Sequence, residues 1–518
     1  MTTSTAEAPA ASDRTAGEDF GRRVIGAAQW RVLSSILQAG LQFGLGVVLA
    51  RLLTPSDFGL AAMAAVVVAL ATLLLDLGLG AAVVQRNPIT ERHVRVAATL
   101  GVLLGSLLAV GTLLIAPLAG SLLRAENLPA VLRAQAILFV LAGVGVTSRA
   151  LLQRSLRFRQ LALVDLVSYG LGYAPLSLVL ALNGFGVWSL VVGALLQSLL
   201  ANTLAVSVAR HPWRPLLAWP EARELLRFGS VGALNGAVGQ LAFHGDNLVV
   251  GRLLGAPVLG LYGRAFSLMM LPLWYVGNTL FSVLFPALTE LRNDRRRFAR
   301  AYLLAVQFVT LVTGPVMVGM AVAAPHLIRV LYGPSWDGVV APFQIFCAVG
   351  TFRILAMPAG AVTHALGQID AELRRQVVYA IWVIAGAAIG SRWGIAGAAA
   401  GVATGILYKY VAMGALTLRI GGAGWSEYLG AQAPGVVVAA FVGAVAGLVR
   451  WTCERGGMSS PEVLLAITGA CALAMVAGIF LLPGRLRPEE LFDRLSRAAT
   501  PLPVPVRLSV RWALRSHG

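Results

Sequence analysis

Residues 51–60 of this chain read RLLTPSDFGL, and residues 252–261 read RLLGAPVLGL, so the same Arg-Leu-Leu and Gly-Leu return 201 residues later. Two further matches follow in the same order at a spacing of 208 residues: Ala116-Pro117 with Leu123 returns as Ala324-Pro325 with Leu331, and Gly186-Val187 returns as Gly394-Ile395. Solenoid repeats are only about 20–50 residues long. The spacing therefore predicts two related halves of about 200 residues each.

The composition places these halves in a membrane. The chain is 58% hydrophobic and 12% charged, and its mean hydropathy is +0.78. The net charge of +18 raises the possibility of a nucleic-acid partner, but the arginines lie between long apolar runs, which is typical of membrane topology. Cys347, Cys453 and Cys471 are too scattered for a disulfide framework or a metal site. We therefore predict no nucleic-acid partner, no metal and no cofactor.

Apolar runs of about 20 residues are long enough to cross a bilayer as helices. The sequence contains about fourteen of them, and the predicted fold class is an all-α polytopic membrane protein. The predicted spans are 25–49, 59–85, 96–119, 131–152, 161–182, 187–208, 228–251, 265–289, 301–323, 340–364, 376–391, 394–417, 429–449 and 462–483.

The distribution of arginine predicts the orientation. With the amino terminus in the cytoplasm, most arginines fall on cytoplasmic segments. Those on the outer side are only Arg51, Arg124, Arg252, Arg264, Arg329, Arg392, Arg450 and Arg455. Both termini are therefore predicted to be cytoplasmic, and the location to be the plasma or inner membrane.

Each half holds six predicted spans, and an even number makes the two repeats parallel, about an axis along the membrane normal. Transporters use this arrangement to rock two bundles around a central site. The predicted parts are a disordered cytoplasmic tail (1–22), an N-terminal six-helix lobe (23–210), a C-terminal six-helix lobe (211–420), two additional transmembrane helices (421–484) and a basic cytoplasmic tail (485–518).

Several motifs resemble one known family. They are the run Leu49 to Leu60, Asp76-Leu77-Gly78-Leu79-Gly80, the segment Leu152 to Arg159, Gly184-Phe185-Gly186-Val187-Trp188, and the run Asp246 to Gly255. In this order they resemble the polysaccharide transporter (oligosaccharide-lipid flippase) branch of the multidrug/oligosaccharidyl-lipid/polysaccharide exporter superfamily, over about residues 20–420.

The resemblance implies a central cavity, alternating access and a lipid-linked oligosaccharide substrate, such as a polyprenyl-diphosphate-linked one. The substrate would move from the inner to the outer leaflet during biosynthesis of a cell-surface polysaccharide, lipopolysaccharide or exopolysaccharide. Glycosyltransferases and a glycan polymerase would be its partners, together with membrane lipids.

Ionisable groups within spans are costly, so each is a candidate site residue. The cations are Arg31, Arg353 and Lys409, and arginine suits a diphosphate because its planar fork donates two hydrogen bonds. Arg31 has a second interpretation, snorkelling to the cytoplasmic interface. Gln42 and Asn247 offer hydrogen bonds to sugars, or bonds between helices. Arginines within residues 154–160 are a further place for the diphosphate to gather at the cytoplasmic interface.

Asp76, Asp165 and Asp246 are candidates for ion coupling, and Asp246 is also a candidate cavity residue. The alternative interpretation is that these carboxylates pair with nearby arginines or cap helices.

Two other functions remain open from the sequence. One is a small-molecule or multidrug cation antiporter of the same superfamily, which would favour an anionic cavity. The other is a membrane-embedded sugar polymerase, which would favour a sizeable extramembrane loop with acidic or basic catalytic groups. The longest outer connections are short and poor in carboxylates, and the sequence has neither clustered catalytic carboxylates nor a P-loop. We therefore predict a transporter and not an enzyme, driven partly by membrane potential.

Overall fold

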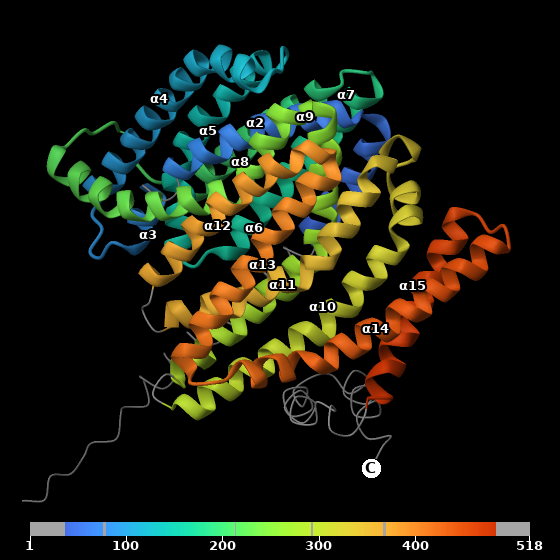
Figure 1. Ribbon diagram of the computed structural model, residues 1–518. Coiled ribbons are helices and arrows are strands. Elements are labelled where there is room, and N and C mark those ends of the chain that lie inside the picture. Colours follow the sequence, from blue (N-terminus) through green and yellow to red (C-terminus); the bar gives the residue numbers. More distant parts are fainter. Residues whose placement is uncertain (1–36, 76–78, 213, 292–293, 366–368, 483–518) are drawn as a thin grey trace, which may run out of the picture. The chain divides into compact units, whose positions relative to one another are not determined.

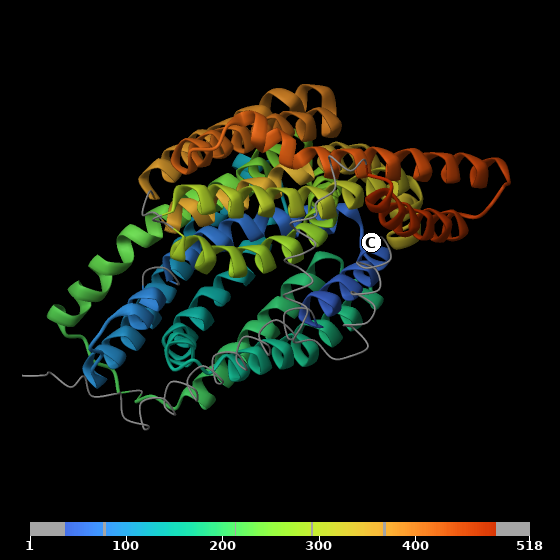
Figure 2. The ribbon, with the colours of Figure 1, turned by 90° about the horizontal axis from the view of Figure 1, so that it is seen from below.

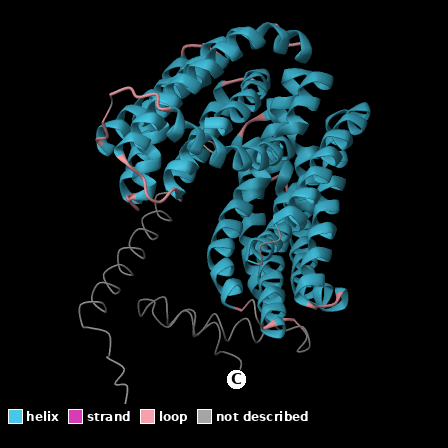
Figure 3. Cartoon of the chain, turned by 90° about the vertical axis from the view of Figure 1, so that its left-hand side faces the viewer, coloured by secondary structure: helices cyan, strands magenta, loops and turns pink. Residues whose placement is uncertain are grey.

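The computed structural model describes residues 37–75, 79–212, 214–291, 294–365 and 369–482. The chain divides into two compact units, Met1–Gly260 and Leu261–Gly518. Figure 1 shows the helices in chain order, and within the described ranges the regular structure contains helices and no strand (Figure 3). The prediction of an all-α polytopic membrane protein is confirmed. The predicted tails at 1–22 and 485–518 lie outside the described residues.

The first unit is built from a succession of apolar helices. They are the Leu37–Leu52 helix, α2 (Pro55–Leu75), α3 (Ala81–Gln85), α4 (Glu91–Leu123), α5 (Leu128–Arg154), α6 (Phe158–Val167), the π-helix η2 (Ser168–Tyr173), α7 (Ala174–Leu182), α8 (Val187–Ala209) and the first part of α9 (Trp219–Glu290). Gly255 has a φ of 85° and interrupts α9, which is therefore two helices in sequence. Glycine tolerates this conformation because it has no Cβ.

The second unit continues from α9. Its helices are α10 (Arg295–Leu331), the 3-10 helix η3 (Pro334–Val339), α11 (Val340–Ala365), α12 (Ile369–Gly390), the 3-10 helix η4 (Ser391–Trp393), α13 (Gly394–Gly421), α14 (Trp425–Arg455) and α15 (Ser460–Phe480). Figures 1 and 2 both show α14 and α15 as an adjacent pair, and apolar side chains of the two helices pack with Leu311 of α10.

The helices agree with the predicted spans. Among the described residues, eleven helical segments are long and apolar enough to cross a membrane. One of these segments, Asp370–Gly421, contains both α12 and α13. The Leu37–Leu52 helix and the part of α9 before Gly255 lie where two further spans are predicted. Helices of the described residues thus lie at each of the fourteen predicted spans, and the first span, 25–49, is described only from residue 37.

The first repeated motif begins α2 by supplying its cap. The Thr54 hydroxyl donates to a carboxylate oxygen of Asp57 at 2.7 Å, and the same carboxylate accepts the Thr54 N–H at 2.9 Å. Pro55 takes the first helical position, where no backbone donor is needed. Thr-Pro-Ser-Asp therefore satisfies backbone groups that the start of a helix leaves open.

The two copies of this motif also contact each other, within the first unit. A Cβ on Gly59 would collide with the carbonyl of Ala256, and a Cβ on Gly260 would collide with the carbonyl of Pro55. Pro55 and Ala256 are equivalent in the repeat, as are Gly59 and Gly260, so the contact is reciprocal. This pattern is typical of a local two-fold relation between two copies of a motif.

Another repeat-related pair shares an unusual backbone. Gly186 and Gly394, 208 residues apart, have φ values of 54° and 74°, and each precedes or begins a membrane-crossing helix. A residue with a side chain rarely adopts this conformation. The repeat read from the sequence is therefore also a repeat of local structure.

Small residues allow several helices to approach closely. A Cβ on Gly101 of α4 would collide with the carbonyl of Gly143 of α5, and one on Gly386 of α12 would collide with the carbonyl of Gly401 of α13. The hydrophobic effect between helices is weak in lipid, so the van der Waals contacts of this close backbone approach hold the helices together instead.

The start of α9 packs against α3 and α4 within the first unit. Ala222 and Leu225 are 1% exposed and pack with Val83 of α3 and Ala97 of α4. The predicted lobe boundary at 210/211 lies inside the first unit. The division into lobes therefore stays a prediction.

Candidate functional site

Two of the predicted cations, Arg353 of α11 and Lys409 of α13, meet at one tyrosine of α12. Arg353 Nη1 donates to the Tyr379 hydroxyl at 2.9 Å, and Lys409 Nζ lies 4.9 Å from the centre of the Tyr379 ring. Tyr379 is only 3% exposed, whereas both cations are half-buried. Three neighbouring helices of the second unit thus bring two positive charges together within the membrane-crossing region.

Neutral side chains are among the groups that contact the two cations. Lys409 Nζ donates to Gln376 Oε1 at 2.8 Å, and the Arg353 guanidinium lies 5.0 Å from the centre of the Phe266 ring. Glu372, one helical turn before Gln376, accepts a hydrogen bond from Thr363 and also interacts electrostatically with Lys409. A phosphate oxygen can take the place of the tyrosine or glutamine oxygen as acceptor, because an ionised acceptor forms a stronger hydrogen bond.

A second group of polar side chains continues from this cluster. Tyr410, the residue after Lys409, exchanges hydrogen bonds with Gln432 of α14 at 2.9 and 3.0 Å. Tyr428 stacks on both Tyr410 and Tyr302, with ring centres 5.8 and 6.1 Å apart. These buried rings join α13, α14 and α10, so they stabilise the helix that presents Lys409.

Two more predicted cavity residues are consecutive on α9, in the first unit. Asp246 is 3% exposed, and one of its carboxylate oxygens accepts the N–H of Asn247 at 3.0 Å. The Asn247 amide lies 3.5 Å from Nδ1 of His244. Asp246 and Asn247 therefore belong to a local polar group, and their sharing a cavity with Arg353 and Lys409 stays a prediction.

The remaining candidates have different surroundings. Asp165 accepts a hydrogen bond from Arg149 at 2.7 Å, which is the geometry expected of the arginine-pairing interpretation; its role in ion coupling stays a prediction. Gln42 is exposed on the Leu37–Leu52 helix. Arg31 and Asp76 lie outside the described residues.

Arg154 caps a helix in the first unit. Its Nη1 donates to the carbonyls of Val83 and Val84, at 3.1 and 3.0 Å, and also to that of Arg86. Carbonyls at the end of a helix such as α3 lack partners within the helix. A cation there is also attracted to the negative end of the helix dipole. Arg154 thus stabilises the end of α3, and its part in gathering a diphosphate stays a prediction.

Just outside α8, a histidine connects the following loop to α5. His211 Nε2 lies 2.9 Å from the Ser148 hydroxyl, and both side chains are buried. Burial lowers the pKa of His211, because desolvation disfavours the imidazolium form. This contact fixes the loop between α8 and α9 on the first unit.

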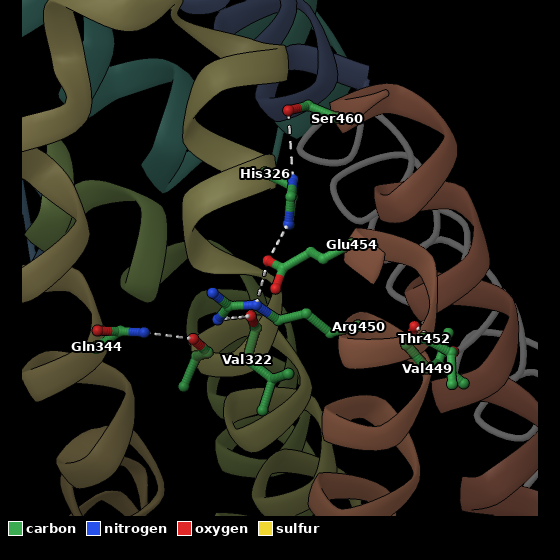
Figure 4. A network of polar contacts seen from close by, with 9 residues as sticks. Val322, His326, Gln344, Val449, Arg450, Thr452, Glu454 and Ser460 are labelled. Carbon is green, nitrogen blue, oxygen red and sulfur yellow. Dashed lines mark hydrogen bonds and ion pairs between the residues drawn. The ribbon is translucent and has the colours of Figure 1, made fainter. Parts of the chain in front are cut away.

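A polar network joins α14 and α15 to α10 (Figure 4). Glu454 Oε1 accepts hydrogen bonds from His326 Nε2 at 2.9 Å and from Arg450 Nε at 2.8 Å. His326 Nδ1 lies 3.3 Å from the Ser460 hydroxyl, and Arg450 Nη1 donates to the Val322 carbonyl at 3.3 Å. The network ties α14 and α15 to α10 in the second unit.

Comparison with known proteins identifies the family. Residues 48–341 match the family described as "Polysaccharide biosynthesis protein", which is more than half of the chain. The chain belongs to this family of polysaccharide transporters. The family predicted from the sequence motifs is thereby confirmed.

Relatives of this chain are similar to it in sequence over most of their length. Lipopolysaccharide biosynthesis protein WzxC from Escherichia coli (strain K12) is 26% identical over 372 residues, which are 71% of this chain and 75% of the relative. Succinoglycan biosynthesis transport protein ExoT from Rhizobium meliloti (strain 1021) is 29% identical over 387 residues, which are 70% of this chain and 78% of the relative. The two matches thus cover 75% and 78% of the relatives' own length.

Solved structures show the same fold. Lipid II flippase MurJ in an inward closed conformation has a TM-score of 0.72 at 13% identity, and the match covers 86% of this chain and 97% of MurJ. An inward-facing multidrug resistance MATE transporter has a TM-score of 0.60 at 17% identity, covering 74% and 95% of the two chains. At these identities the likeness establishes the fold alone.

The sequence of this family member does not distinguish Tyr379, Gln376 or Phe266 as contacts of Arg353 and Lys409. Each is neutral and lies within an apolar run, so charge and hydropathy do not distinguish it. The available signal was the three-residue spacing of Gln376 and Tyr379, which places both on one face of α12.

Proposed function

We propose that this polysaccharide transporter moves a lipid-linked oligosaccharide from the inner to the outer leaflet by alternating access. The observation that most supports the proposal is the meeting of Arg353 and Lys409 at Tyr379, within a membrane-crossing unit. Two cations in this environment attract anions, and Glu372 supplies one negative charge near Lys409. The diphosphate of a polyprenyl-linked oligosaccharide carries more than one negative charge and has acceptor oxygens for both cations.

Each side chain of the cluster has a distinct part in the proposed binding. Arg353 donates two parallel hydrogen bonds to one phosphate, and Lys409 neutralises the other as a point charge. Tyr379 and Gln376 hold the two cations between transport events, at 2.9 and 2.8 Å. The apolar tail remains in lipid while the polar head moves.

The proposed setting is the plasma or inner membrane, with both termini in the cytoplasm. The transporter makes and breaks no covalent bond in this scheme. Glycosyltransferases must therefore build the lipid-linked oligosaccharide before transport, and a polymerase must consume it afterwards.

Transport by purified protein in liposomes tests the proposal. A fluorescent polyprenyl-diphosphate oligosaccharide is placed in one leaflet, and its appearance in the other is followed with a membrane-impermeant reagent. Arg353→Gln removes a charged donor, so we expect the initial rate to fall about 10- to 100-fold, because hydrogen bonds to charged groups contribute about 1.5–3 kcal/mol. Lys409→Gln should also slow transport.

Arg374→Gln is the matched control, because Arg374 is an exposed arginine on the same helix as Tyr379. Its rate should equal that of the unmodified protein. Unchanged transport in both Arg353→Gln and Lys409→Gln would exclude the cluster as the head-group site. Export of a cationic dye in place of the oligosaccharide would instead support the antiporter alternative.

A further inference from the structure

A cavity of about 960 Å³ lies in the second unit, between the beginning of α10 and the turn from α13 to α14. Arg295 and Arg296 line it at the first turn of α10 and are exposed. Leu303, Leu304 and Gln307 line it further along the same helix and are half-buried. From Arg295 to Gln307 the helix rises by about 18 Å. The cavity thus has a basic end and a more apolar end.

The charge in this cavity is strongly positive. Four arginines and one glutamate are among its lining residues. The glutamate, Glu427, accepts the N–H of Gly424 at 3.1 Å, and Arg297 pairs with Asp294 at 3.3 Å. Glu427 and Arg297 thus interact with residues at the first turns of α14 and α10. Arg295 and Arg296 present their charge to a ligand in the cavity.

We infer that this cavity binds the head group of an anionic phospholipid. α10 crosses the membrane from Arg295, so its first turns lie at the depth of the lipid head groups. Basic pockets between transmembrane helices bind anionic head groups in this way. Leu303 and Leu304 add contacts for the upper part of the acyl chains. A free phosphate or diphosphate ion shares the head-group chemistry but makes no use of the leucines or of most of the volume.

Native mass spectrometry of the purified full-length protein tests the inference. The protein is titrated with phosphatidylglycerol, phosphatidylcholine and inorganic diphosphate. We expect phosphatidylglycerol to bind more tightly than phosphatidylcholine. The double variant Arg295→Gln, Arg296→Gln should weaken phosphatidylglycerol binding about 30-fold, since each basic residue near an anionic membrane surface contributes about fivefold. Its binding of phosphatidylcholine should not change.

Two further variants make the result specific. Arg223→Gln with Arg374→Gln removes the same charge at exposed positions outside the cavity, and should leave phosphatidylglycerol binding unchanged. Ala431→Trp keeps the charge and fills the cavity, and should weaken binding as much as the double arginine variant does.

Three outcomes would overturn the inference: wild-type affinity in the Arg295, Arg296 double variant, equal weakening in the Arg223, Arg374 control, or inorganic diphosphate binding as tightly as phosphatidylglycerol. The third outcome would assign the cavity to free anions. Each readout is lipid binding in the absence of transport, so failure here leaves the proposed function untouched.

Discussion

Tyr379 interacts with the two cations through different parts of its side chain. Its hydroxyl accepts from Arg353 at 2.9 Å, while the face of its ring lies 4.9 Å from Lys409 Nζ. The ring attracts a cation through its quadrupole, and the hydroxyl does so through a hydrogen bond. One neutral residue can therefore keep two like charges near each other without cancelling either charge.

Substitution of Tyr379 separates these contributions. We expect Tyr379→Phe to keep the contact with Lys409 and to slow transport about fivefold, because one hydrogen bond contributes about 1 kcal/mol. Tyr379→Leu removes the ring as well and should slow transport further. Initial rates in liposomes measure both effects, with thermal unfolding in detergent as the check on folding. A Tyr379→Phe rate equal to wild type would show that the hydroxyl does not position Arg353.

At the scale of elements, the repeated motif places α2 and α9 in reciprocal contact. Gly59 faces the carbonyl of Ala256, and Gly260 faces that of Pro55. Backbone atoms, unlike the end of a flexible side chain, cannot move aside independently of their helices. The close crossing therefore depends on the absence of a Cβ at both glycines.

Alanine at either glycine should separate these two elements. We expect Gly59→Ala and Gly260→Ala each to lower the free energy of unfolding by about 1–3 kcal/mol, the usual cost of overpacking. Denaturant titration in micelles measures the change. Gly111→Ala is the control, because a Cβ there has no neighbour within 4 Å. Equal stability of the Gly59 variant and this control would show that the crossing is not tight.

Energy supply belongs to the scale of the whole molecule. The sequence contains no P-loop, and its only lysine is Lys409, within α13. A diphosphate moving outward from an inside-negative cell gains about 2.3 kcal/mol per charge per 100 mV. The membrane potential can therefore drive the proposed transport of an anionic head group.

Liposomes with an imposed potential test this expectation. A potassium gradient with valinomycin sets the interior negative, and outward movement of the lipid-linked oligosaccharide should then be faster than at zero potential. Reversing the gradient should slow it. Sodium and proton gradients imposed separately show whether an ion is also coupled. Identical rates at all potentials would exclude the electrical contribution.

The sequence alone predicted the fold and the family of this chain. The cost of placing backbone and charge in lipid makes a membrane-crossing helix visible as a long apolar run, and arginine marks the ends of such runs. The repeat at Arg51 and Arg252 predicted two related halves, and in the structure the glycines shared by its two copies lie where the backbones cross closely. Arg353 and Lys409 stood out for the same reason, as charges within apolar runs.

Only the tertiary structure decided which groups the charged side chains contact. Arg154, a candidate for gathering the diphosphate, caps α3, and Asp165, a candidate for ion coupling or for pairing with an arginine, pairs with Arg149. Neither charge nor hydropathy distinguished Tyr379 and Gln376, because a neutral side chain in an apolar helix does not reveal its partner. Hydropathy gives the preference of each single residue for lipid over water. A binding site depends instead on which side chains three separate helices bring together.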